Sequence, residues 1–161
     1  MLVLGIDPGS TVTGYGVVRK HRGRLHLVDA GCIRTRSSDP IPHRLTLIHH
    51  GLIAALAQHQ PDAVAIESIF RHKSSESALR LGQARGVALL AAAQAGFEPF
   101  EYNPSTIKRT VGAHGKADKA MMQKMVRMLL GVEVPGPADV ADAVAIAITH
   151  HAHANALRAA R

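Results

Sequence analysis

The sequence predicts an α/β domain with a mixed five-stranded sheet, antiparallel on one side and parallel on the other, flanked by helices. Two observations predict this fold class. Three β-like runs with short turns come first, and helical and β-like segments then alternate toward the C-terminus. Strands joined by short turns form an antiparallel meander, whereas strands separated by helices pair in parallel. We expect one domain over residues 1–161, because this length supports one core and the sequence has no repeat or linker.

The first part of the chain consists of three predicted strands. Each is a run rich in Val, Leu and Ile, and the segment "HRGR" supplies the turn between the second and the third. The predicted strands cover Leu2–Asp7, Thr13–Lys20 and Arg24–Arg34. Together they predict the antiparallel part of the sheet.

The second part alternates between helices and strands. Apolar residues at helical spacing from Leu45 to Leu56 predict a helix that ends by Pro61. The continuous apolar run "DAVAIES" is typical of a central parallel strand. Asn103 followed by Pro104 indicates a helix start, because asparagine caps helices and proline fits their first turn. The other predicted elements are a helix over Ser74–Ala95, a strand over Phe97–Tyr102, a helix over Lys116–Gly131 and a last helix over Ala138–Leu157.

The composition indicates an anionic partner. Lys and Arg number 19 against 12 Asp and Glu, which gives a net charge of +7 at pH 7. Nucleic acid is the first candidate, although a basic composition also serves solubility alone. The single cysteine, Cys32, excludes a disulfide within the chain and a thiolate metal cluster. No stretch is typical of a signal peptide or a transmembrane helix, so we expect a cytoplasmic protein.

Four carboxylates stand where strands end or a helix begins. Asp7 ends the first strand, Glu67 ends the run "AVAIE", and Asp139 and Asp142 share a face at the start of the last helix. These positions can converge at one edge of the sheet. Four carboxylates without a basic neighbour in sequence would repel one another, and divalent cations would relieve this. Oxygen ligands suit Mg²⁺ or Mn²⁺, and two such ions about 4 Å apart can support phosphodiester hydrolysis.

Each acid also has an alternative interpretation. Asp7 could cap the Pro-Gly turn, and Asp139 and Asp142 could complement the helix dipole. Glu67 is harder to explain in this way, because a charge directly after a buried strand is costly. The prediction of a metal site therefore depends on all four occurring together.

Considered together, these residues and their surroundings resemble the RuvC family, the bacterial crossover junction endodeoxyribonucleases. The similarity covers nearly the whole chain and follows the family's order and spacing. The motifs are "LGIDPGSTVTGYGV", "GCIRT", "AIESIF", "SALRLGQARGVALLAA", "FEYNPSTIKRTVGAHGKADK", "VRMLL" and "DVADAVAIAITH". One departure is Ser68, which stands where a longer polar residue is frequent in the family.

The resemblance implies an RNase H-like fold and a Mg²⁺-dependent nuclease that acts as a homodimer. The implied substrate is a four-way (Holliday) junction, cut by symmetric nicks that leave 5′-phosphate and 3′-hydroxyl ends. The implied partner is a branch-migration complex of the RuvA and RuvB type. The family's acid tetrad falls on Asp7, Glu67, Asp139 and Asp142, where Mn²⁺ could replace Mg²⁺.

Further residues are candidates for DNA binding. The resemblance places a family aromatic at Phe70 and two family lysines at Lys108 and Lys119. An aromatic followed by positive charges also suits base stacking, and lysines suit phosphate contacts. The alternatives are a core phenylalanine and solvated helix faces. The remaining candidates for backbone contacts are Arg71, Lys73, Arg80 and Arg85.

Two features near the helices stay open. His150, His151 and His153 could suggest a metal site, but we interpret them as a frayed helix end and expect a flexible tail after about residue 153. Gly82 and Gly86 would allow close helix approach, either to a second copy of the chain or to its own sheet.

Three other functions compete with a resolvase. The segment "GIDPGST" resembles the first phosphate loop of actin-like ATPases and sugar kinases, but 161 residues leave no room for the second domain those folds need. The smaller RuvX-like relatives share an early Asp-Gly motif, but they lack the "SALRLGQARG" helix. A non-catalytic four-way-junction-binding protein of the same fold would have the same basic surface, but it would not need all four acids.

Overall fold

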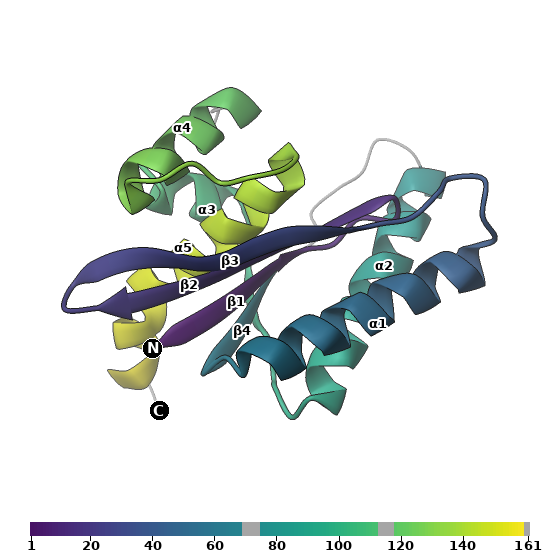
Figure 1. Cartoon of the computed structure of the whole chain (residues 1–161), viewed down its shortest axis with the longest axis horizontal. Coiled ribbons are helices and arrows are strands. Elements are labelled where there is room, and N and C mark those ends of the chain that lie inside the picture. The colour runs from purple at the N-terminus through teal and green to yellow at the C-terminus, as the bar shows by residue number, and fades with distance from the viewer. Residues whose placement is uncertain (69–74, 113–117, 160–161) are drawn as a thin grey trace.

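The structure is a computed structural model that describes residues 1–68, 75–112 and 118–159 (Figure 1). Its sheet has the strand order β3-β2-β1-β4-β5. β1, β2 and β3 pair antiparallel, whereas β4 is parallel to β1 and β5 is parallel to β4. The predicted mixed sheet is therefore confirmed. The strands are β1 Leu2–Asp7, β2 Val12–His21, β3 Arg24–Arg34, β4 Ala63–Glu67 and β5 Phe100–Tyr102.

Helices cover both faces of this sheet, which gives three layers (Figure 1). α1 and α2 pack on one face, and α5 crosses the other face together with α3 and α4. The helices are α1 Ile41–His59, α2 Ser75–Gln94, α3 Pro104–Thr110, α4 Lys119–Leu130 and α5 Ala138–Ala159.

Local signals set the start of α3 and both ends of α4. The Asn103 side chain accepts a hydrogen bond from the Thr106 amide, as predicted for an N-cap, and Gly131 ends α4 in a left-handed conformation. The predicted start of α4 at Lys116 is wrong, because Asp118 is its N-cap and accepts from the Met121 amide.

The strand predicted over Phe97–Tyr102 is also shorter than expected. The Phe97 amide donates to the Ala92 carbonyl, so the residues after α2 complete the end of that helix instead of joining the sheet. Only Phe100–Tyr102 forms β5.

Alternation along the strands divides the core into two. On β1, Leu4 and Ile6 pack with α1 and α2, whereas Val3 packs with α5. On β4, Val64 and Ile66 follow the first pattern and Ala65 the second. Residues at the odd positions of these two strands therefore face α5.

Three glycines allow α5 to lie directly on β1 and β2. A Cβ atom at Gly5 would lie 2.2 Å from the Ala143 carbonyl oxygen, and one at Gly14 would lie 2.2 Å from the Asp139 carbonyl oxygen. A Cβ atom at Gly16 would lie 2.4 Å from a methyl carbon of the Val144 side chain. Any larger residue would push the helix away, so these positions set the height of α5 above the sheet.

The interpretation of the three histidines as a frayed helix end is wrong. His150 and His151 are only 3% and 2% exposed. The His151 ring donates from Nε2 to the Val18 carbonyl at 2.9 Å, and the His153 ring lies 3.2 Å from the Thr110 hydroxyl. The sequence alone could not reveal these contacts, because they join elements far apart in the chain. α5 itself continues to Ala159, and a flexible tail stays a prediction.

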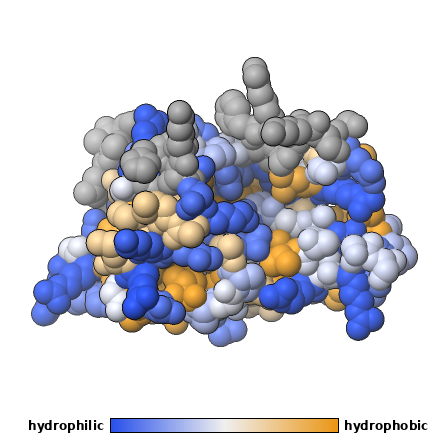
Figure 2. All heavy atoms as spheres, turned by 90° about the horizontal axis from the view of Figure 1, so that it is seen from above, coloured by the Kyte–Doolittle hydropathy of each residue, from blue (hydrophilic) through white to orange (hydrophobic). Residues whose placement is uncertain are grey.

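The visible face in Figure 2 is mainly hydrophilic and is interrupted by apolar patches. Several large apolar side chains reach solvent, including Leu79 and Leu90 on α2 and Met128 on α4. Within the described ranges, no helix is both long and apolar enough to cross a membrane.

Candidate active site

Asp7 and Glu67 come from neighbouring parallel strands and face the same helix. The register pairs Ile6 with Ile66, so each acid stands one residue beyond this pair. Both acids occupy odd positions, which face α5. The ends of β1 and β4 therefore bring the two carboxylates together from segments 60 residues apart in sequence.

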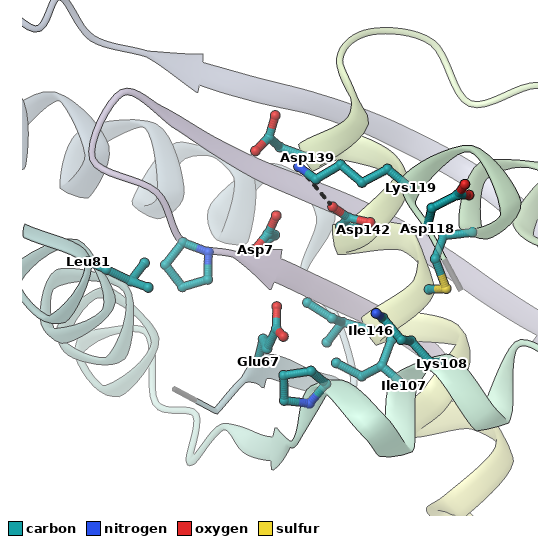
Figure 3. A pocket seen from close by; sticks show the side chains of 13 residues that line it. Asp7, Glu67, Leu81, Ile107, Lys108, Asp118, Lys119, Asp139, Asp142 and Ile146 are labelled. Carbon is teal, nitrogen blue, oxygen red and sulfur yellow. Dashed lines mark ion pairs between the residues drawn. The ribbon is translucent and has the colours of Figure 1, made fainter. Parts of the chain in front are cut away.

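The other two acids come from the first turns of α5. Asp139 and Asp142 line the same pocket as Asp7 and Glu67, a cavity of about 530 Å³. Figure 3 shows Asp7 at the centre, with Glu67 on one side and Asp139 and Asp142 on the other. The structure therefore brings the four acids together in one pocket, as predicted. Their catalytic role is a separate question.

The loop after Asp7 is firmly held. Arg44 on α1 is 1% exposed, and its guanidinium donates from Nη2 to the Ser10 carbonyl at 2.6 Å. The Thr35 hydroxyl donates to the same carbonyl, also at 2.6 Å. On the other side, the Thr13 hydroxyl donates to the Gly9 carbonyl at 2.8 Å. A buried arginine without a local sequence signal thus supports the strand end that carries Asp7, and sequence analysis missed it.

Burial and mutual repulsion make this cluster electrostatically unfavourable. Burial raises the pKa of Asp7 well above its ordinary value, and the charges of Glu67, Asp142 and Asp139 raise it further. The pKa of Glu67 rises to about 7, chiefly through burial and then through Asp142. Burial also raises the pKa of Asp142. A cation or a proton that binds to these oxygens would therefore stabilise the site.

Two lysines supply part of that charge. Lys119 at the start of α4 lies 3.9 Å from Asp142, measured from Nζ to Oδ2, and Lys108 reaches toward the pocket from α3 (Figure 3). Both ammonium groups lower the pKa of Glu67 and of Asp142. The Lys119 side chain is 70% exposed, so it is accessible to an anionic ligand at the mouth of the pocket.

The chemistry of the donors fits a divalent cation. The four acids offer only oxygen atoms, the ligands that Mg²⁺ and Mn²⁺ prefer. The raised pKa values of Asp7, Glu67 and Asp142, caused first by burial, mean that a bound cation would stabilise their charged forms. No three His, Cys, Asp or Glu side chains in the described ranges already form an arrangement that could hold an ion.

A fifth carboxylate, Asp118, also lines the pocket, and sequence analysis did not single it out. Its Oδ1 accepts a hydrogen bond from the Met121 amide at 2.8 Å, so it serves as the cap of α4. The remaining lining is largely apolar and includes Pro8, Leu81, Ile107 and Ile146.

The structure describes only some of the other predicted DNA-binding residues. Phe70, Arg71 and Lys73 lie outside the described residues. Arg80 pairs with Glu76 one helical turn away, at 2.5 Å on the exposed face of α2. Arg85 pairs with Glu101 and donates from Nε to the Glu67 carbonyl at 3.3 Å, so in this structure it supports the end of β4.

A mixed sheet of this strand order, covered by helices on both faces, defines an RNase H-like α/β protein. The family model for "Crossover junction endodeoxyribonuclease RuvC" matches residues 3–150. The chain belongs to this RuvC family.

Individual relatives agree with this assignment. The crossover junction endodeoxyribonuclease RuvC of Desulfitobacterium hafniense is 48% identical over 158 residues, which cover 98% of this chain and 96% of the relative. The structure of Thermus thermophilus RuvC superimposes with a TM-score of 0.85 at 38% identity, covering 97% of this chain and 96% of that one. The same protein in complex with a Holliday junction substrate gives a TM-score of 0.87 at 35% identity, with the same coverage. The family therefore favours an endonuclease over a protein that only binds junctions.

Proposed function

We propose that this protein is a metal-dependent Holliday junction resolvase that acts in homologous recombination and repair. It cuts four-way DNA junctions by symmetric paired nicks and leaves 5′-phosphate and 3′-hydroxyl ends. The observation that supports this most is the convergence of four carboxylates around Asp7 in a pocket with lysines at its rim. The proposal includes a cytoplasmic location, where the DNA of a bacterial cell is found.

The four acids Asp7, Glu67, Asp139 and Asp142 would hold the metal, Mg²⁺ or Mn²⁺, with two ions in each site. When bound, these ions supply activation of the attacking water and neutralise charge on the leaving oxygen. Lys108 and Lys119 orient the scissile phosphate and stabilise the charge that develops on it. Pro8 is buried at the turn after Asp7 and helps to keep that strand end rigid.

Other residues would contact the junction away from the cut. Phe70 would stack on a base at the opened crossover, and Arg71, Lys73 and Arg80 would contact the phosphate backbone. Arg85 is an additional candidate only if DNA displaces its contact with Glu101. The complex that moves the junction would be of the RuvA and RuvB type.

Cleavage of a synthetic four-way junction tests the function directly. With Mg²⁺ present, we expect symmetric nicks in two strands of the junction and no cuts in a linear duplex of the same sequence. Chelation of the metal should remove cleavage and leave junction binding. Tight binding without cuts, in either Mg²⁺ or Mn²⁺, would support the non-catalytic alternative.

Two symmetric cuts need two active sites, and we propose that a twofold homodimer provides them. The dimer interface would be the outer face of α2. A Cβ atom at Gly82 or at Gly86 would meet nothing within 4 Å, so these glycines do not pack on the chain's own sheet. Leu79 and Leu90 are 63% and 51% exposed on the same face. Small residues between exposed leucines suit a close helix–helix contact.

The variant Gly86→Arg is expected to break this dimer. It would bury an unpaired charge in the interface and raise the dimer dissociation constant by at least about a hundredfold. Sedimentation velocity measures the change, and Ala54→Arg on the exposed face of α1 adds the same charge elsewhere as a control. If Gly86→Arg sediments as a dimer like the control, the interface lies on another surface.

A further inference from the structure

A buried hydrogen bond joins the edge of the sheet to α5. The Tyr102 hydroxyl on β5 and Nδ1 of His150 on α5 lie 2.9 Å apart, and the two residues are 8% and 3% exposed. The Phe100 ring packs on the same imidazole with ring centroids 4.4 Å apart. His150 is thus held from two positions on the shortest strand of the sheet.

The backbone of Tyr102 contacts the strand that carries Glu67. Tyr102 is the register partner of Glu67 across β4 and β5. The Tyr102 carbonyl also accepts a hydrogen bond from the Ser68 amide at 2.8 Å, directly after Glu67. One residue therefore connects to the end of β4 through its backbone and to α5 through its side chain.

On α5, His150 lies on the same helix face as Asp142, one of the other acids. Asp142, Ile146 and His150 follow at intervals of four residues, so they share one face of α5. Asp142 and Ile146 both line the pocket. Eight residues along a helix span about 12 Å, so a shift at His150 is transmitted to Asp142 with little loss.

We propose that Tyr102 and His150 are a positioning pair that fixes the Glu67 end of β4 relative to Asp142 on α5. Neither residue touches the reacting phosphate. The pair acts by holding two acids from different elements at the separation that the reaction needs. This inference rests on the proposed nuclease function, since it concerns the rate of the same cut.

The variant Tyr102→Phe tests the pair by removing one oxygen atom. Tyr15→Phe is a matched control, because Tyr15 is the only other tyrosine and its hydroxyl bonds Asp29 on the opposite face of the sheet. Single-turnover cleavage of a bound junction should fall about tenfold in Tyr102→Phe and little in Tyr15→Phe. Junction affinity in metal-free buffer should stay within about twofold for both, because binding does not need the acids to be aligned.

A second readout does not depend on activity. Hydrogen exchange at the Ser68 amide should become faster in Tyr102→Phe and stay unchanged in Tyr15→Phe, in protein without DNA or metal. Equal cleavage and equal exchange in the two variants would overturn the proposal. If the wild type cleaves the junction in the same assay, that failure would leave the proposed function intact.

Variants of His150 separate the hydrogen bond from simple packing. His150→Asn keeps a polar atom near the position of Nδ1, and His150→Leu keeps bulk without one. We expect the asparagine variant to retain more cleavage per folded molecule than the leucine variant. The reverse order would assign the role to the contact with Phe100 and overturn the role of the hydrogen bond.

Discussion

Replacement of Asp7 by asparagine is expected to lower junction cleavage by at least about a hundredfold while junction binding remains. Asp7 lies at the centre of the acid cluster, and three other carboxylates raise its pKa. The change removes one charged ligand oxygen from the metal site and leaves the shape of the side chain. It also removes a negative charge near the DNA, so binding should stay equal or become tighter.

Asp118→Asn is the matched control for this experiment. Asp118 lines the same pocket, but its carboxylate caps α4, and asparagine caps helices as well as aspartate does. Cleavage by this variant should stay within a few-fold of the wild type. Measured under single-turnover conditions with Mg²⁺, an equal loss in both variants would mean that the pocket responds to total charge and that Asp7 has no special role as a ligand.

The sequence was sufficient to predict where the acids converge. Asp7 and Glu67 end short apolar runs that are typical of buried strands, and strand ends of a parallel pair meet at one edge. Asp139 and Asp142 lie in the first turns of a long apolar helix, and such a helix is expected to cover the sheet. These signals are local, since each depends on a few neighbouring residues, and for that reason they could be recognised without a structure.

The roles of Arg85 and His150 could not be predicted in the same way. Arg85 seemed suited to DNA by its charge, but it pairs with Glu101 and supports the Glu67 carbonyl. His150 bonds Tyr102, which is 48 residues away in sequence. Both contacts depend on which elements become neighbours in space. Neither the periodicity nor the composition of the sequence predicts which elements these are.

The two pocket lysines illustrate an intermediate case. Their charge and the family motif pointed to phosphate contacts, and the structure brings Lys108 and Lys119 to the pocket from two different helices. What the sequence could not show is the proximity of Lys119 to Asp142. In the protein without DNA, this lysine already interacts with the acid cluster, so the proposed phosphate contact would require it to exchange one negative partner for another.

Gly14→Ala is expected to disable the enzyme by moving α5, although Gly14 has no functional group. The added Cβ would lie 2.2 Å from the Asp139 carbonyl oxygen, whereas real Cβ atoms essentially never approach another heavy atom this way within 3.0 Å. The helix start that carries Asp139 and Asp142 would have to move by roughly 1 Å, a displacement that can reduce catalysis about a hundredfold. The same overpacking should lower the free energy of unfolding by about 1–3 kcal/mol.

Gly51→Ala shows whether overpacking by itself explains such a loss. Its added Cβ would also be crowded, at 2.5 Å, but by the Ile33 side chain between α1 and β3, which can rotate away. Comparing the two variants by denaturant unfolding and by cleavage well below the unfolding transition separates stability from geometry. We expect both to fold and only Gly14→Ala to lose cleavage per folded molecule.

If Gly14→Ala cleaves like Gly51→Ala once the folded fraction is accounted for, the position of α5 over β1 and β2 does not control the acid cluster. The glycines would then serve packing alone, because a helix that can shift this far without affecting the cut cannot be what aligns its ligands.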